Sequence, residues 1–270
     1  MLGTMSSPAN EPANEPAREP ASTPACAPVE AVVLFDVDNT LLDNDAVQED
    51  LSGFLQRELG ASLRERYWAI FEALRSELGY ADYLGALQRL RLEAADDPRL
   101  PLVSAFLLDY PFADRVYAGA LAAIGHMARL GTTVILTDGD MVMQPNKIRR
   151  AGLWDAVAGR VLIYIHKEQM LASVERRYPA SHYVLVDDKL RILTAVKRYW
   201  GDRVTTVFPR QGHFAHDASA VAANPPADLS IGGIGDLAGY DGNTFSAHES
   251  STNYGTNYGT NDGTNDGQPA

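Results

Sequence analysis

Short apolar runs alternate with amphipathic stretches along most of the chain. The apolar runs have the composition of strands, and they cover Ala31–Val37, Thr132–Thr137, Val161–Ile165, His182–Val186 and Arg203–Phe208. Between them, apolar residues recur at helical spacing over Val116–Leu130, Gln144–Ala151, Lys167–Arg177 and Lys189–Tyr199. Continuous apolar strands separated by helices are typical of a parallel sheet covered on both faces. The pattern therefore predicts an α/β fold of this kind, to which Asp228–Ile231 adds a last short strand.

The interval between the first two strands is too long for a single crossover and has a helical periodicity of its own. Apolar residues recur at helical spacing in three successive stripes, and Pro101–Tyr110 is a candidate fourth helix. We expect these helices to pack mainly on one another, so that residues 45–110 form a small helical module inserted after the first strand. The stripes are Val47, Leu51, Phe54, Leu55 and Leu59, then Leu63, Tyr67, Ile70, Leu74 and Leu78, then Tyr83, Leu84, Leu87 and Leu90.

Both ends of the chain differ in composition from its middle. Proline stands at every fourth position from Pro8 to Pro28, and Thr252–Gly267 is a four-residue repeat of Gly and polar residues. Such segments lack the apolar residues that a core requires, so we expect them to be disordered. The sequence thus divides into a Pro-rich tail at 1–28, a core domain at 29–44 and 111–240, the helical module at 45–110, and a repeat tail at 241–270.

The composition of the 270 residues limits the classes of function. An apolar fraction of 46% is ample for a core, while a formal net charge of -12 without a Lys/Arg run argues against nucleic-acid binding. Cys26 is the single cysteine, so an internal disulfide is excluded. No segment has the pattern of a secretory signal or a membrane span. We therefore expect a soluble, cytoplasmic protein with no nucleic-acid or membrane partner. The sequence does not indicate its oligomeric state.

Polar side chains follow four successive predicted strands. Ligands of parallel sheets bind beyond the carboxyl ends of the strands, so these side chains should share one edge. Carboxylates gathered there repel one another unless a cation lies among them, and magnesium prefers oxygen ligands. The sequence therefore predicts a Mg2+ site formed by Asp36, Asp38, Asp187 and Asp188. The strand-end residues are Asp36 and Asp38, then Thr137, Asp138 and Asp140, then His166 and Lys167, then Asp187, Asp188 and Lys189.

These residue types suit phosphoryl transfer, in which catalysis depends on positioning and charge stabilisation. A carboxylate aimed at phosphorus, here Asp36, can attack in line and form an acyl phosphate. A second carboxyl two residues later, Asp38, can protonate the leaving oxygen and then deprotonate the attacking water. Thr137 can donate a hydrogen bond to a phosphate oxygen, and Lys167 can neutralise charge on the transferring group.

In their order along the chain, these residues resemble the four motifs of the haloacid dehalogenase (HAD) superfamily. DxDxT follows an apolar strand at Asp36–Thr40, Thr137 ends the next strand, Lys167 matches the third motif and Asp187–Asp188 the fourth. DxDxT alone is a weak signal, whereas the ordered set from about Ala31 to Asp188 is specific.

The resemblance carries several implications. It implies a Rossmann-like parallel sheet, bound magnesium, Asp36 as nucleophile, and Asp38 as general acid/base that also offers its backbone carbonyl to the metal. It further implies that the module at 45–110 is a cap, which closes over the site and selects the substrate.

The third and fourth motifs each leave an alternative open. Lys147 is the other candidate for the motif lysine, but its amphipathic surroundings are typical of a surface residue, whereas Lys167 follows a strand end. Asp188 is the firmer metal ligand. Asp187 binds the metal directly, binds it through water, or holds Lys167.

The other polar residues near the motifs have less specific interpretations. Asp138 and Asp140 either line the site or cap the following helix. Thr40 is expected to hydrogen-bond within its loop, and a loop role is expected for His213 and His216. Structural or hinge roles are expected for the remaining residues, His166, Asp43 and Asp45.

The sequence therefore predicts a magnesium-dependent phosphomonoester hydrolase that acts on a small phosphorylated metabolite through an aspartyl-phosphate. The alternatives are a phosphomutase, a C–halogen hydrolase of the same superfamily, and a non-catalytic phosphate-binding scaffold. By resemblance, dehalogenases lack the second aspartate of DxD, so Asp38 argues against that activity.

Overall fold

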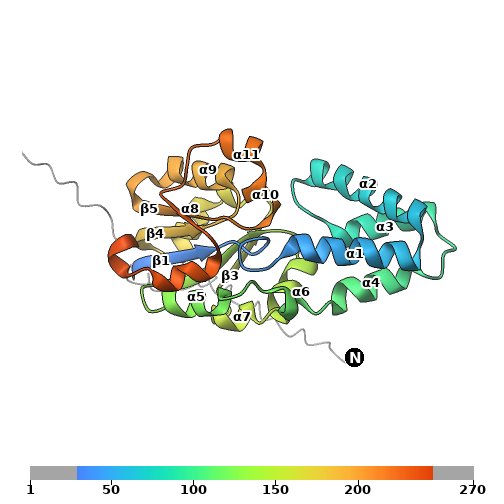
Figure 1. The fold of residues 1–270 in the computed structure, drawn as a ribbon, viewed down its shortest axis with the longest axis horizontal. Helices are drawn as coiled ribbons and strands as arrows, with labels where there is room; N and C mark the ends of the chain where they lie inside the picture. The colour runs from blue at the N-terminus through green and yellow to red at the C-terminus, as the bar shows by residue number, and fades with distance from the viewer. Residues whose placement is uncertain (1–28, 246–270) are drawn as a thin grey trace, which may run out of the picture.

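The centre of the molecule is a parallel sheet of six strands (Figure 1). The computed structural model describes residues 29–245, so the predicted tail at 1–28 and most of the one at 241–270 lie outside them. The predicted boundary of the second tail lies too early, because Gly242–Phe245 forms a 3-10 helix and Phe245 is buried. The strands lie in the order β3-β2-β1-β4-β5-β6, and every neighbouring pair is parallel. The predicted α/β fold is thereby confirmed, including its short last strand. The strands are β1 (Val29–Phe35), β2 (Thr132–Asp138), β3 (Val161–Tyr164), β4 (Ala180–Val186), β5 (Val204–Pro209) and β6 (Leu229–Ile231).

β1 and β4 are neighbours at the centre of the sheet, where the strand order reverses. Val32 of β1 is paired with Thr132 of β2 on one side and with Tyr183 of β4 on the other. In Rossmann-like sheets the crossovers diverge at such a switch point and leave a crevice beyond the carboxyl ends of the strands. The residues that follow β1 and β4 therefore lie where this architecture usually binds ligands.

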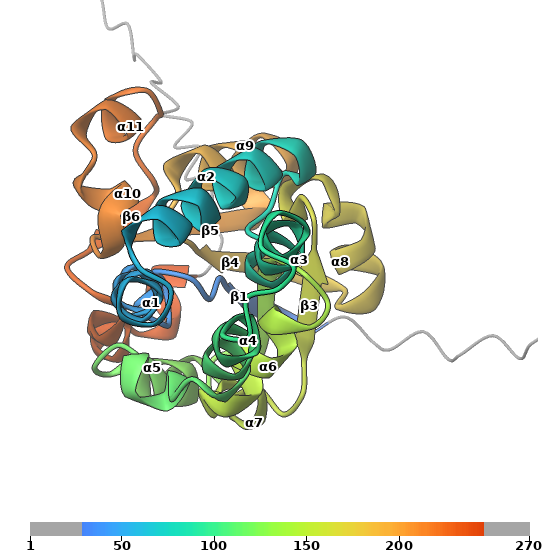
Figure 2. The same ribbon diagram turned by 90° about the vertical axis from the view of Figure 1, so that its right-hand side faces the viewer.

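Helices cover both faces of the sheet, as predicted. Val33 and Phe35 of β1 face one apolar layer and Val32 and Leu34 the other, because successive side chains of a strand alternate. Figure 2 shows the helices of the two layers on opposite sides of the strands. The first layer includes α5 (Ala120–Met127), α6 (Met143–Arg150) and α7 (Leu153–Ala156), and the second includes α8 (Leu171–Arg177) and α9 (Leu190–Trp200).

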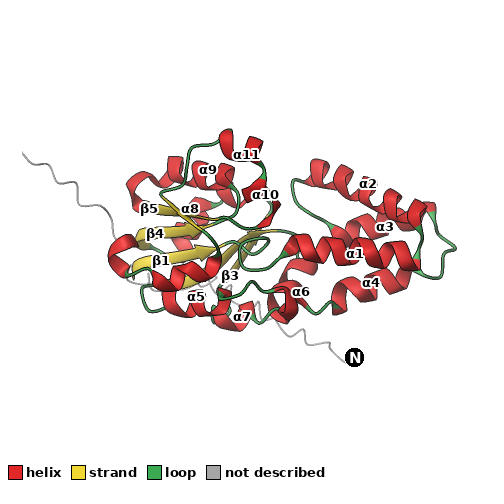
Figure 3. Cartoon of the chain, in the orientation of Figure 1, coloured by secondary structure: helices red, strands yellow, loops and turns green. Residues whose placement is uncertain are grey.

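Five α-helices lie between β1 and β2 along the chain, and we call the first four of them the inserted helices. They lie beyond the end of the sheet from which β1 exits (Figures 1 and 3). Asp43 caps the first of them by accepting a hydrogen bond from Ala46 N (2.9 Å). We call the junction between the loop after β1 and this helix, which includes Asp43 and Asp45, the hinge. The inserted helices are α1 (Asn44–Glu58), α2 (Ala61–Leu78), α3 (Tyr83–Glu93) and α4 (Leu100–Asp109).

Short elements complete the described chain, and one of them contacts an inserted helix. α10 (Gly212–His216) and α11 (Ala218–Ala222) follow β5, and α10 contacts α1 (Figure 2). None of the helices within residues 29–245 is both long and apolar enough to cross a membrane. The 3-10 helices are η1 (Phe112–Arg115), η2 (Lys167–Gln169), η3 (Gly201–Arg203), η4 (Ile234–Gly239) and η5 (Gly242–Phe245).

Candidate active site

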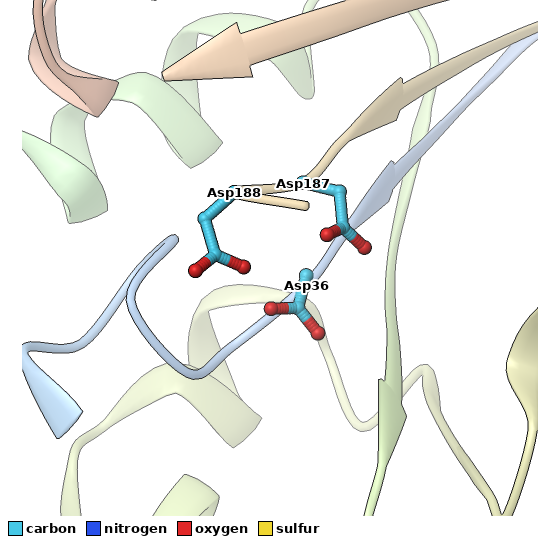
Figure 4. Close-up of side chains that lie close together, drawn as sticks. All are labelled: Asp36, Asp187 and Asp188. Atoms are coloured by element: carbon cyan, nitrogen blue, oxygen red, sulfur yellow. The ribbon is translucent and has the colours of Figure 1, made fainter. Parts of the chain in front are cut away.

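Three carboxyl groups meet beyond the carboxyl ends of β1 and β4. Asp36 follows β1, Asp187 and Asp188 follow β4, and one oxygen from each lies within 4.8 Å of the others. Figure 4 shows the three side chains directed toward one another. All three are buried. The switch point thus carries a buried cluster of like charges, which requires positive charge close by.

Lys167, at the start of η2, supplies part of that positive charge. Its Nζ lies 2.5 Å from Asp36 Oδ1 and 2.6 Å from Asp187 Oδ2. Burial raises the pKa of Asp36, but the ammonium groups of Lys167 and Lys189 outweigh this effect and hold that pKa below its ordinary value. Asp36 is therefore ionised at neutral pH, which a carboxylate nucleophile requires. The position of Lys167 agrees with its predicted place in the site.

The carboxylate of Asp188 is buried without a hydrogen-bond partner among the described residues, at either oxygen. Lys189 Nζ lies 3.9 Å from its Oδ1. Burial raises the pKa of Asp188 well above its ordinary value. Burial also raises the pKa of Asp187. Unpartnered buried oxygens are costly, and a hard divalent cation has the chemistry to satisfy them. The donor set of Asp36, Asp187 and Asp188 therefore fits such a cation.

Thr40 connects the loop after β1 to the end of β4. Its hydroxyl accepts a hydrogen bond from Asp188 N (3.0 Å) and donates one to Asp36 Oδ2 (3.3 Å). The loop is closed by the N–H groups of Leu41 and Leu42, which both donate to Val37 O. Thr40 thus has the hydrogen-bonding role expected of it, and it fixes the spacing between the two strand ends.

The side chain of Asp38 lies apart from the three clustered carboxylates. Its Oδ1 accepts a hydrogen bond of 2.6 Å from Lys147 Nζ, and the side chain remains 23% exposed. Among the described residues, the carboxylates close enough together to hold a metal ion are those of Asp36, Asp187 and Asp188. The carboxylate of Asp38 is thus not part of this cluster, and the contribution of its backbone carbonyl that the family resemblance implied stays a prediction.

The prediction that Lys147 is a surface residue is wrong. Its side chain is 1% exposed, and Nζ donates to Asn44 Oδ1 (3.0 Å) as well as to Asp38. The periodicity of α6 could not reveal this, because the burial comes from helices distant in the sequence. Asn146, the preceding residue, donates to Leu108 O of α4 (2.8 Å), so the inserted helices pack against this part of α6.

Thr137 lies at the end of β2 with its hydroxyl held by Gln144, a residue that sequence reasoning missed. Gln144 Nε2 donates to Thr137 Oγ1 (3.0 Å), and that hydroxyl donates to Asp138 O (3.3 Å). Asp138 accepts a hydrogen bond from Lys167 N (2.7 Å), and burial raises its pKa to about 6. Asp140 instead accepts from the N–H groups at the start of α6. Of the two alternatives weighed for these aspartates, Asp138 adjoins the site and Asp140 caps a helix.

The segment that contains α10 is bound to the hinge of the inserted helices. His213 Nδ1 lies 2.6 Å from Asp45 Oδ1, and His213 N donates to Asp45 Oδ2 (2.8 Å). Asn39 Nδ2 also donates to Asp45 (2.9 Å), and Gln211 Nε2 donates to Thr40 O (2.6 Å). His213 therefore joins the α10 segment to the start of α1.

Together, the fold and the site define a class: a doubly wound α/β protein whose switch point carries a buried carboxylate cluster and a lysine. Residues 31–198 match the model of the family described as haloacid dehalogenase-like hydrolase, so the chain belongs to that family. The resemblance read from the four motifs is thereby confirmed at the level of the family.

Solved structures of other proteins agree with this assignment. A protein from Burkholderia xenovorans LB400 with the same family description is 63% identical, and the match covers 79% of this chain and 100% of that one, with a TM-score of 0.76. An L-2-haloacid dehalogenase from Xanthobacter autotrophicus is 18% identical (77% and 96% covered, TM-score 0.51). A magnesium-bound HAD hydrolase from Bacillus subtilis is 16% identical (77% and 96% covered, TM-score 0.51). The last two likenesses show the fold alone. A search of the curated proteins gave no match.

Proposed function

We propose that this hydrolase is a magnesium-dependent phosphomonoesterase that forms an aspartyl-phosphate on Asp36. The observation that carries the proposal is the arrangement at the switch point. A buried carboxylate is kept ionised by Lys167 and lies beside the unpartnered oxygens of Asp188. Asp36, Asp187 and Asp188 would hold the cation, which when bound neutralises charge on the phosphate oxygens.

The side chains of the site divide the chemical work in two steps. A carboxylate oxygen of Asp36 attacks phosphorus, the bond to the ester oxygen breaks, and Asp38 gives that oxygen a proton. Asp38 then takes a proton from water, whose oxygen attacks the phosphorus and releases phosphate from Asp36. The partial exposure of Asp38 supports this role, because an acid/base must reach both the leaving group and water. Lys167 stabilises charge on Asp36 throughout.

The inserted helices act as a cap that favours a small phosphorylated metabolite. They stand over the sheet edge that carries the site (Figure 1). They also approach the core at a second place, the turn after α2. A Cβ added at Gly79 in this turn would lie 2.3 Å from the ring of His166, the residue before Lys167. Contacts at both the hinge and this turn support closure around a compact ligand and exclusion of water.

C–halogen hydrolysis is the rival activity, because an L-2-haloacid dehalogenase shares the fold. Asp38 favours the phosphatase. It is a second carboxyl two residues after the nucleophile, a position at which, by resemblance, dehalogenases have none. Hydrolysis of a C–halogen bond does not need such an acid, because the departing halide takes no proton. A phosphomutase would use the same pair of aspartates, and isomerised product in place of free phosphate would identify it.

Release of p-nitrophenol from p-nitrophenyl phosphate tests the proposal. The wild-type protein should release it with magnesium and not with a chelator, and Asp36→Asn should lower kcat roughly 10^3-fold or more while the circular dichroism spectrum is retained. Asp155→Asn, a substitution at an exposed position on α7, is the control. Halide release from 2-chloropropionate without metal, together with no hydrolysis of aryl phosphates, would establish C–halogen hydrolysis instead.

A further inference from the structure

The buried lysine on α6 is not needed for the chemistry described so far. Lys167 already supplies the ammonium group at the nucleophile, whereas Lys147 lies against the other aspartate of the DxD motif. A second fully buried lysine in one site is costly unless its hydrogen bonds are satisfied. Both of its hydrogen-bond acceptors, Asp38 Oδ1 and Asn44 Oδ1, are side chains next to the hinge.

The hydrogen bonds continue from Lys147 into the inserted helices. Asn44, the first residue of α1, accepts from Lys147 through Oδ1 and donates through Nδ2 to the hydroxyl of Tyr83 (3.2 Å). Tyr83 is the first residue of α3 and also accepts from Gln48 Nε2 of α1 (2.9 Å). The Lys147 ammonium lies 5.9 Å from the centre of the Tyr83 ring. We call this connected set of Asp38, Lys147, Asn44 and Tyr83 the acid–cap chain.

Each link of the acid–cap chain belongs to a different part of the molecule. Asp38 comes from the loop after β1, Lys147 from the core helix α6, and Asn44 and Tyr83 from two inserted helices. A carboxylate held at one oxygen by a fixed ammonium has its other oxygen directed, so proton transfer gains from the placement. The fixed ammonium depends in turn on Asn44, which is the first residue of an inserted helix.

We propose that Lys147 is a positioning residue that makes the placement of Asp38 for proton transfer depend on the packing of the inserted helices against the core. The inference rests on the proposed phosphatase function and adds a second purpose to cap closure. Closure does not only exclude water. It also sets the acid that protonates the leaving group, so an open enzyme holds its nucleophile ready but lacks an aligned acid.

The leaving group provides a test that general damage to the fold would not reproduce. Phenyl phosphate and p-nitrophenyl phosphate are similar in shape, but phenolate is a much poorer leaving group and needs the proton more. kcat/KM reports the first, phosphoryl-transfer step for both esters. Lys147→Met should lower kcat/KM for phenyl phosphate about 10- to 100-fold more than for p-nitrophenyl phosphate, since general acid catalysis contributes about 10^2- to 10^4-fold.

Tyr83→Phe gives a milder variant that retains the ring and its packing against Phe71. It removes only the hydroxyl that accepts from Asn44. The ratio of kcat/KM for p-nitrophenyl phosphate to that for phenyl phosphate should therefore rise about threefold. Lys197→Met is the matched control, because Lys197 of α9 pairs with Asp228 and is remote from the acid–cap chain. This substitution should lower kcat/KM for both esters equally or leave both values unchanged.

The possible results separate the two proposals. With an active wild-type enzyme, equal losses for both esters in Lys147→Met and Tyr83→Phe would overturn the inference alone. If the wild-type protein releases phosphate from neither ester in the presence of magnesium, the proposed function falls and the inference falls with it. The expected result is a larger difference in kcat/KM between the two esters in both variants, and a still larger one in Asp38→Asn.

Discussion

At the scale of single residues, Asp188 lowers the stability of the metal-free protein. Both its oxygens are buried without a hydrogen-bond partner in the described part of the chain, and burial raises its pKa well above the ordinary value. A carboxyl with a raised pKa binds more protons in the folded than in the unfolded state, so the free energy of unfolding falls as pH rises above the ordinary value. The penalty is therefore present at neutral pH and absent in strong acid.

Asp188→Asn should consequently stabilise the protein when a chelator is present. At pH 7 we expect the free energy of unfolding to rise by about 1–3 kcal/mol, and the gain to shrink as the pH is lowered toward the ordinary pKa of a carboxyl. Added magnesium should raise the Tm of the wild-type protein and leave that of the variant unchanged. Thermal unfolding followed by circular dichroism measures both effects, and equal stabilisation by magnesium would contradict the assignment.

The site residues that sequence reasoning found share one property, a position at the end of an apolar strand. Asp36, Lys167 and Asp188 could be placed together because parallel strands end at a common edge. Lys147 could not be placed there, because the apolar pattern of α6 indicates only that a polar residue lies on this helix. Its burial arises from contacts with Asp38 and Asn44, and a single sequence contains no signal for such a contact.

At the scale of elements, the strands and the long helices were predictable, and the two short helices after β5 were not. The four stretches of the helical module and all six strands were located to within a few residues, because burial imposes a period on each. α10 and α11 have five residues each, which is too short for a period to emerge. The one local signal was Asp217, which caps α11 by accepting from Ser219 N and Ala220 N.

The contact between α10 and the hinge can be tested through Asp45. Burial raises the pKa of Asp45, but hydrogen bonds from Asn39 and His213 outweigh it, so that pKa lies below its ordinary value. The ionised carboxylate therefore stabilises the fold above the ordinary pKa, and this stability is lost as the pH falls through the lowered value. Asp45→Asn should lower the free energy of unfolding by about 1–2 kcal/mol at pH 7, and progressively less in acid.

Chemical denaturation of the Asp45→Asn variant at several pH values gives the measurement. Asp202→Asn, at an exposed position in η3, is the matched control and should change the free energy of unfolding by less than about 0.5 kcal/mol. A loss for Asp45→Asn that stays constant from pH 7 to pH 3 would show that the charge of this carboxylate is not what holds α10 to the hinge.

At the scale of the whole molecule, Gly79 allows the inserted helices to approach the core closely. It ends α2 with a left-handed backbone (φ 83°), which glycine adopts without strain. A Cβ at this position would lie 2.3 Å from His166 Cε1. Gly79→Ala should therefore cost about 1 kcal/mol through backbone strain and, separately, raise KM because the turn after α2 is pushed from the core.

Combining Gly79→Ala with His166→Ala separates the two effects. The small side chain at position 166 removes the collision but leaves the backbone strain, so KM for p-nitrophenyl phosphate should return toward that of His166→Ala alone while the lower Tm persists. If the increase in KM remains in the double variant, the turn after α2 does not act through its approach to His166.

The central position of β1 also determines when the active site can form during synthesis of the chain. The ribosome makes β1 and Asp36 first, yet β1 meets its neighbour β2 only after the inserted helices have been made, and β4 later still. Until then an apolar strand is unpaired on both sides and prone to aggregate, and the nucleophile has no counter-charge. A chain terminated before β4 would carry the attacking group, but it would lack both the strand that pairs with the second side of β1 and the oxygens of Asp187 and Asp188 that complete the ion site.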